Sequence, residues 1–131
     1  MLVERKTRQR DAIKSAIRAS KRPLLPQEIL AQASAAAPGI GLATIYRNLK
    51  SLVADGSVQV ITLPGDSPRY ETTQSDHHHH FQCTKCERVY DVPGCPGNLR
   101  GLAPRGFTVE RHEVTLYGRC SDCGKHASHA R

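Results

Sequence analysis

The sequence predicts an α+β protein made of two small domains, and three observations support this class. Residues 1–72 contain three segments with helical spacing of apolar residues, followed by two short alternating segments. Residues 77–131 contain two Cys-x-x-Cys pairs and four consecutive histidines among short β-like segments. Positive charge is concentrated at one end: residues 1–60 hold ten Lys and Arg against four Asp and Glu, whereas the remainder holds nine against eight. Residues 73–76 are the expected hinge.

The apolar content of the chain is low for its 131 residues. Hydrophobic residues make up 38%, with four Tyr, two Phe and no Trp. We expect a metal ion or a dimer interface to supplement so small a core. No apolar run approaches membrane-spanning length, and the first residues lack the apolar segment of a signal peptide. We therefore expect a cytoplasmic protein with no membrane partner, whose paired cysteines hold metal rather than form disulfides.

The first two helices are expected in the basic half. The first covers 7–19, with basic residues on its outer face. The second begins at Pro26, because proline suits the first helical position, and ends at Pro38-Gly39. The apolar positions expected to face the core are Ala12, Ile13, Ala16 and Ile17 in the first helix, and Ile29, Leu30 and Ala33 in the second.

The third helix starts with the stretch 41–52 and is expected to end at Asp55-Gly56. Its expected buried positions are Ile45, Leu49, Leu52 and Val53. Tyr46, Arg47 and Lys50 lie off that stripe and present one aromatic ring and two cations outward. Alternation over 58–63, a Pro- and Gly-containing turn, and 69–71 then predict a β-hairpin.

Three helices followed by a hairpin form the pattern of a winged helix-turn-helix domain. In that fold the third helix enters the major groove of double-stranded DNA while cations contact phosphates. The alternative is a helical module with a merely solvated basic face and no DNA partner. The charge asymmetry favours DNA.

The second half is expected to consist mainly of strands. Predicted strands cover 81–83, 89–92 and 107–117, with a turn at 93–97 and at most a short helix over 98–103. No regular element is expected after Cys123.

Four cysteines carry the strongest chemical signal, namely Cys83, Cys86, Cys120 and Cys123. Two Cys-x-x-Cys knuckles on different strands can supply four thiolates, the donor set of a closed structural zinc site. Two redox dithiols are the alternative, but a reactive pair normally occurs once, at a helix N-terminus.

The four histidines at 77–80 lead directly into the first cysteine pair. On an extended strand alternate side chains face opposite ways, so His77 and His79 would share one face and His78 and His80 the other. That arrangement suits two metal sites better than one. The alternative is a purification tag or a solvated tract, but this run is internal and leads into a strand. Further candidate ligands are Glu71, Cys95 and His112.

These donors suit Zn²⁺, Fe²⁺ or Mn²⁺, and a sulfur ligand shifts the preference toward zinc. A catalytic metal site would need a general base and a substrate pocket, which the sequence does not mark. We therefore expect no enzymatic activity.

Three stretches, 41–49 (GLATIYRNL), 77–86 (HHHHFQCTKC) and 106–123, resemble the ferric uptake regulator (Fur) superfamily of metal-sensing repressors, and its zinc uptake regulator members in particular. The resemblance implies an N-terminal winged-helix domain and a small C-terminal α/β dimerisation domain. It also implies a homodimer on palindromic operators and structural zinc at the four paired cysteines. Thr44, Tyr46 and Arg47 match the family's recognition helix, to which Lys50 adds an outward cation.

The resemblance also implies two further metal sites. A regulatory hinge site would use Glu71, His78 and His80, and a second site would use His77, His79 and His112. Two departures leave ligands open. The hinge histidine that many members supply before the second helix would fall near Pro23, and Cys95 stands where members often carry a glutamate. Cys95 is either a ligand of the second site or an ordinary thiol.

The expected function is a zinc-responsive repressor of metal-uptake genes. An iron- or manganese-responsive regulator, or a peroxide sensor, is the alternative within the family. A metal-binding enzyme or a zinc carrier is the alternative outside it.

Overall fold

The structure is a computed structural model that describes residues 2–74, 78–95, 97 and 99–127. The chain divides into two compact units, Met1–Gln74 and Ser75–Arg131. Their boundary falls within 73–76, the expected hinge, of which 75 and 76 lie outside the described residues. Among the helices described, none has both the length and the apolar character that a membrane crossing requires.

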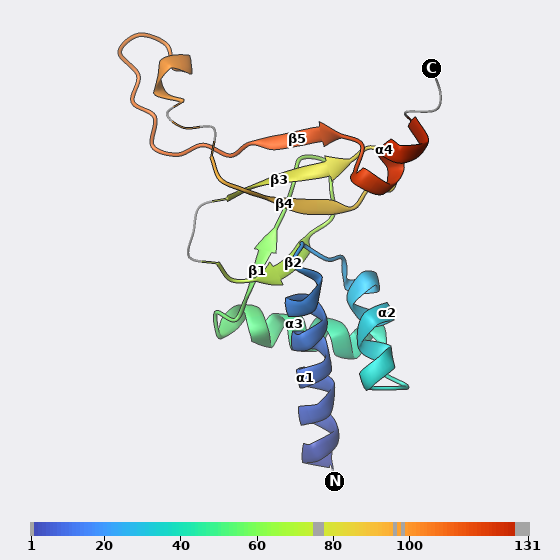
Figure 1. Cartoon of the computed structure of the whole chain (residues 1–131). Coiled ribbons are helices and arrows are strands. Elements are labelled where there is room, and N and C mark those ends of the chain that lie inside the picture. The colour runs from blue at the N-terminus through green and yellow to red at the C-terminus, as the bar shows by residue number, and fades with distance from the viewer. Residues whose placement is uncertain (1, 75–77, 96, 98, 128–131) are drawn as a thin grey trace. The chain divides into compact units, whose positions relative to one another are not determined.

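The N-terminal unit contains three helices, α1 (Leu2–Ser20), α2 (Pro26–Ala36) and α3 (Leu42–Ala54) (Figure 1). The first helix begins five residues earlier than the expected range of 7–19. Glu4, Arg5 and Lys6 are exposed and give no apolar period, but they are good helix formers, and the acidic Glu4 suits the first turn. The second and third helices begin within one residue of their expected positions.

The core of this unit lies where the three helices meet the hairpin. Its buried apolar residues are Ala12, Ile13, Ala16, Ile17, Leu24, Ile29, Ala33, Ala37, Ile40, Ile45, Leu49, Leu52 and Val58. The prediction that Val53 is buried was wrong, because it is 36% exposed. Ile45, Leu49 and Leu52 already fill the face of α3 toward the core, and Val53 falls at its rim.

The hairpin consists of β1 (Val58–Ile61) and β2 (Arg69–Thr72), which pair antiparallel from Val58↔Thr72 to Ile61↔Arg69. A second connection joins it to the segment before α2. The Leu24 amide donates to the Tyr70 carbonyl at 2.9 Å, and the Tyr70 amide donates to the Leu24 carbonyl at 2.8 Å. The hairpin is thereby fixed to the helical part of the unit.

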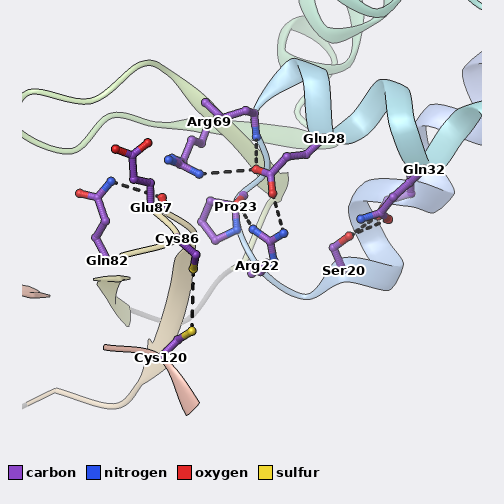
Figure 2. A network of polar contacts seen from close by, with 12 residues as sticks. Ser20, Arg22, Pro23, Glu28, Gln32, Arg69, Gln82, Cys86, Glu87 and Cys120 are labelled. Atoms are coloured by element: carbon purple, nitrogen blue, oxygen red, sulfur yellow. Dashed lines mark hydrogen bonds and ion pairs between the residues drawn. The ribbon is translucent and has the colours of Figure 1, made fainter. Parts of the chain in front are cut away.

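A buried arginine, Arg69, reinforces this connection. Its side chain is 2% exposed and donates from Nε to Asp66 at 2.6 Å, while one terminal nitrogen lies 3.5 Å from Glu28 Oε1. Glu28 also accepts a hydrogen bond from Arg22 at 2.6 Å (Figure 2). A further hydrogen bond comes from the Leu25 amide at 3.0 Å. Partial burial opposes ionisation of Glu28, but the bonds from Arg22 and Leu25 and the two positive charges outweigh it and lower the pKa of this carboxyl.

The C-terminal unit is built on a three-stranded sheet with the order β4-β3-β5 (Figure 1). The central strand β3 (His78–Cys83) pairs antiparallel with β4 (Val89–Pro93) and parallel with β5 (Thr115–Gly118). A 3₁₀ turn, η1 (Arg100–Leu102), falls in the range expected for a short helix.

Two predictions about this unit were wrong. The third strand covers only 115–118 rather than 107–117, because β5 pairs with β3 only from His80 to Cys83 and 107–114 has no strand beside it in the described chain. After Cys120 the chain forms a helix, α4 (Ser121–Ala127), where no element was expected. A helix of seven residues is too short to show an apolar period.

The Glu28 contacts lead to a testable prediction. Glu28→Gln removes the negative charge beside Arg22 and Arg69, so the free energy of unfolding should fall by about 1 to 2 kcal/mol at neutral pH. Because folding lowers the pKa of Glu28, its contribution is present above the ordinary value of 4.5 and is lost as pH falls below it. Urea unfolding followed by circular dichroism at several pH values measures both effects.

Gln27→Ala on the exposed side of the same helix is the control, and it should leave stability nearly unchanged. A difference between Glu28→Gln and the parent protein that persists undiminished at acid pH would contradict this account.

Candidate metal centres and a basic cleft

The four paired cysteines come together in the C-terminal unit. Cys83 ends β3, Cys86 lies in the following turn, Cys120 follows β5 and Cys123 lies in α4. Their sulfur atoms all lie within 4.8 Å of one another, and those of Cys86 and Cys120 are 3.8 Å apart (Figure 2). The expectation that both knuckles lie on strands was wrong for the second one, which spans the start of α4.

The thiol pKa values show how the cluster distributes charge. The Cys86 amide, which donates to the Cys83 sulfur at 3.4 Å, and the Cys120 amide lower the pKa of Cys83 to about 5. The bond with Cys120, together with burial, raises the pKa of Cys123 to about 12. The pKa is thus lowered for Cys83 and Cys120 and raised for Cys86 and Cys123, so two thiols ionise readily while the other two resist. A divalent cation would allow all four to ionise together, so this donor set fits a structural zinc ion.

Tyr90 supports the cluster from β4 and was not identified from the sequence. Its hydroxyl bonds the Cys120 sulfur, which lowers the pKa of that thiol, although the Cys123 amide contributes more. Burial and the neighbouring sulfurs raise the pKa of Tyr90 itself. Such partners hold metal ligands in place.

A second group of ligands lies on one face of the sheet, at the start of β3. The rings of His78 and His80 are 5.0 Å apart, and Asp91 Oδ1 lies 3.5 Å from His78 Nε2 and 3.3 Å from His80 Nε2. Asp91 reaches them because it is the register partner of His80 on β4. This group, hereafter the His78 group, contains two imidazoles and one carboxylate, donors that suit Zn²⁺, Fe²⁺ or Mn²⁺.

Glu71, the remaining residue expected at the hinge site, belongs to the N-terminal unit. It lies on β2, is 2% exposed, and accepts a hydrogen bond at 3.0 Å from the Gln59 side chain of β1. A carboxylate so thoroughly removed from water requires stabilising partners, and a cation is one of them.

The third group, hereafter the Cys95 group, consists of His79, Cys95 and His112, whose ligand atoms lie within 4.8 Å of one another. Cys95 Sγ is 3.0 Å from His112 Nε2, and the rings of His79 and His112 are 5.1 Å apart. The Val114 amide donates to His79 Nδ1 at 3.0 Å, which holds the buried ring in place. Two nitrogens and a sulfur fit zinc. His77, also expected here, lies outside the described residues.

The alternation expected for the histidines is present over the described part of the run. His78 and His80 belong to one group, and His79, between them, belongs to the other. The three groups in the described C-terminal unit therefore share β3 but use different donors.

The N-terminal unit carries a basic cleft of about 390 Å³ between α1 and α3. Its lining contains three cations and no carboxylate, and consists of Arg5, Lys6, Gln9, Thr44, Arg47 and Asn48. Arg47 also donates to Thr44 Oγ1 at 3.0 Å, which aligns it along the first turns of α3. Tyr46 (49% exposed) and Lys50 are exposed on the same helix. Such a surface can accept phosphate groups of a polyanion.

Asp91 and the α1 residues Arg5, Lys6 and Gln9 were absent from the sequence-based site. Asp91 could be found only by knowing the register of β4 against β3. The α1 cations were visible as basic residues, but nothing in the sequence placed them beside α3.

Comparison with known proteins places this geometry in context. The family model described as the ferric uptake regulator family matches residues 4–117. The peroxide operon regulator of Bacillus subtilis is 33% identical over 96 residues, which cover 70% of this chain and 65% of that protein. The chain spans less than two thirds of the length of several curated relatives it matches, between 62% and 65%.

Solved structures are similar as well. A structure described as a zinc-bound manganese uptake regulator superposes with a TM-score of 0.73 at 25% identity, covering 86% of this chain and 87% of that one. FurB from Mycobacterium tuberculosis, described as a zinc uptake regulator, is 29% identical with a TM-score of 0.50, covering 91% of this chain and 95% of that one.

The thiolate cluster yields a prediction. Cys83→Ser should lose tightly held zinc and unfold the C-terminal unit, because a structural zinc ion contributes on the order of 10 kcal/mol of binding free energy to folding. Elemental analysis after purification without added metal, together with circular dichroism, measures both effects.

Cys95→Ser is the matched control, since it removes a thiol outside this cluster and should keep the structural zinc. Retention of the same zinc content and stability by Cys83→Ser would refute the structural role of the cluster.

Proposed function

The chain belongs to the ferric uptake regulator family, and on that premise we propose that it is a metal-responsive transcriptional repressor that binds palindromic operator DNA as a homodimer in the cytoplasm. The genes it controls are then those of metal uptake. The metal-binding enzyme and zinc-carrier alternatives have less support, because the family is one of regulators and the basic helix α3 has no use in either.

The observation that carries this proposal is the division of donors along β3. The all-thiolate cluster at one end suits a permanent structural ion. The His78 and Cys95 groups use nitrogen, oxygen and a single sulfur, and these mixed donors suit exchangeable ions. A protein with both kinds of site in one unit and a basic helix in the other has the parts of a metal-dependent DNA-binding protein.

The DNA interface is proposed to centre on α3. Thr44, Tyr46, Arg47 and Lys50 are the residues expected to contact the operator, and the cations of the basic cleft add phosphate contacts from α1. Phosphate contacts position a protein on DNA while contacts with base edges give sequence specificity. Tyr46, with its exposed ring, is the candidate for base contact.

Apolar surface on the C-terminal unit supports the homodimer. Leu102, Phe107, Leu116 and Tyr117 are 80%, 71%, 48% and 53% exposed in the single chain. Exposed apolar side chains of this number favour a protein interface. The strand-like alternation of 107–114, without a strand beside it in its own described chain, fits pairing with a second copy.

The regulatory site is proposed to combine Glu71 with His78, His80 and Asp91. Asp91 then provides the fourth ligand, in place of the histidine that this chain lacks near Pro23. When bound, a divalent ion would neutralise the two carboxylates and accept the lone pairs of the two imidazoles. Because Glu71 belongs to the N-terminal unit and the others to the C-terminal unit, their joint engagement would restrict the DNA-binding units to one arrangement.

Zinc is the proposed signal because of Cys95. A second site of His77, His79, Cys95 and His112 contains a thiolate, and sulfur donors favour zinc over manganese or iron(II). FurB, described as a zinc uptake regulator, supports this assignment. The two carboxylates of the regulatory site favour the alternative, an iron- or manganese-responsive regulator. The likeness to a peroxide operon regulator keeps a peroxide-sensing role as a further alternative.

The coupling between metal binding and DNA binding can be tested directly. Zinc-loaded protein first selects its preferred DNA fragments from a random-sequence library. Affinity for the selected DNA should rise about tenfold or more on adding zinc to chelator-treated protein, a size typical of coupling between two sites. Asp91→Ala should require more zinc for the same increase, whereas the exposed Asp122→Ala should not. Fluorescence anisotropy of the labelled DNA measures the affinity and the zinc concentration that the increase requires. Equal affinity with and without metal would overturn the proposal. Iron(II) and manganese titrations identify the metal.

The DNA interface yields a separate prediction. Arg47→Ala should weaken operator binding and reduce the slope of log affinity against log salt concentration by about 1, because one phosphate contact is lost. Arg18→Ala removes an equal charge from the exposed C-terminal end of α1, outside the cleft, and should leave the slope unchanged. Equal slopes for the two variants would exclude Arg47 from the interface.

A further inference from the structure

Cys95 differs from the other four cysteines in its neighbours, and it is more exposed than Cys83, Cys120 and Cys123. It follows β4 and the left-handed Gly94, whose φ is 107°. Its side chain is exposed, whereas Cys83 and Cys120 are buried. Its sulfur lies 3.0 Å from His112 Nε2 and has two imidazoles but no other thiol in its group. Any reagent in solution can therefore reach this sulfur from outside.

The thiolate cluster is too far away to react with Cys95. His79 lies near the start of β3 and Cys83 at its end, so four residues of extended strand separate the two groups, about 13 Å at about 3.3 Å per residue. A disulfide requires Cα atoms within about 7 Å. All four other cysteines of the chain belong to that cluster. Oxidation of Cys95 would thus stop at a single sulfur rather than continue to a disulfide within the chain.

We propose that Cys95 is an oxidation site: a hydroperoxide converts its metal-binding thiolate to a sulfenic acid and so releases the ion from the Cys95 group. The inference rests on the proposed function, in which this group holds an exchangeable zinc ion. The response to hydroperoxide is thereby assigned to the sulfur of Cys95.

The reaction balances without another protein group. The Cys95 sulfur, a thiolate while it is a ligand, attacks one oxygen of the hydroperoxide. An S–O bond forms and the O–O bond breaks, and the departing hydroxide or alkoxide takes a proton from water. The sulfur is oxidised and the peroxide is reduced by one electron pair. A sulfenic acid is a poor ligand, so the two imidazoles alone hold the ion too weakly. Two molecules of an external thiol restore the sulfur: the first forms a mixed disulfide and releases water, and the second displaces Cys95 as a thiol.

The thiolate cluster should respond more slowly. There, four sulfurs share one site, and Cys83 and Cys120 are 0% and 7% exposed. Cys86 is exposed and Cys123 is partly exposed, so both are competing targets and the experiment must report on each cysteine separately.

The test uses the zinc-loaded protein of residues 1–131 and hydrogen peroxide. A chromophoric chelator reports zinc release, and peptide mass spectrometry reports oxygen gained at each cysteine. The parent protein should release its more weakly held zinc at the rate at which Cys95 gains one oxygen, and a thiol reductant should restore zinc binding. Cys95→Asp and Cys95→His keep a zinc ligand but remove the sulfur that peroxide oxidises, so each should release zinc at least about tenfold more slowly.

The outcomes separate this inference from the proposed function. If Cys95→Ala binds zinc as tightly as the parent before any oxidant is added, Cys95 is no ligand and the second site of the proposed function fails. If Cys95 contributes to zinc binding but the parent keeps its zinc under peroxide, the oxidation site alone is refuted. Release at the parent rate from Cys95→Asp and Cys95→His, with oxygen found on Cys86 instead, would also overturn it.

Discussion

The pairing of β3 with a strand on each side is the constraint on which the C-terminal unit depends. Hydrogen bonds to β4 and β5 fix the register of β3, so each successive side chain is committed to one face of the sheet. This is why adjacent histidines join different ligand groups and why Cys83, at the end of the strand, joins a third. A slip of one residue would exchange His79 with its neighbours and dismantle the two mixed groups together.

The donors of each group suit a different task. Four sulfurs, two of them buried, form a donor set that fits a closed zinc site, and an ion bound there would stabilise a unit with few apolar residues of its own. The His78 and Cys95 groups have mixed donors and are only partly buried, which in the proposed function would allow ions to exchange there. In the proposed function, placing stability and response in separate groups on one strand would allow a signal ion to leave without unfolding the unit that detects it.

In the N-terminal unit, the apolar core fixes which side chains of α3 are exposed, and the buried Arg69 helps to hold the hairpin in place. Ile45, Leu49 and Leu52 hold one face of the helix inside, and this commits Tyr46, Arg47 and Lys50 to the outside. The hairpin is held by Asp66, Glu28 and the two hydrogen bonds between Leu24 and Tyr70. Glu71, two residues after Arg69 on the same buried face of β2, is fixed by the same framework.

The sequence by itself determined the helices of the N-terminal unit, the four-thiolate cluster and the separation of the histidines, because each depends on a local period or spacing. Only the tertiary structure brought Asp91 beside His80, Tyr90 to Cys120, and Arg5 and Lys6 to the cleft of α3, since these neighbours are set by strand register and helix packing between distant segments. The misplaced start of the third strand has the same origin, whereas α4 was missed because a helix of seven residues is too short to show an apolar period. Alternation marks a segment that could form a strand, whereas a strand forms in this chain only where a neighbouring backbone supplies its hydrogen bonds.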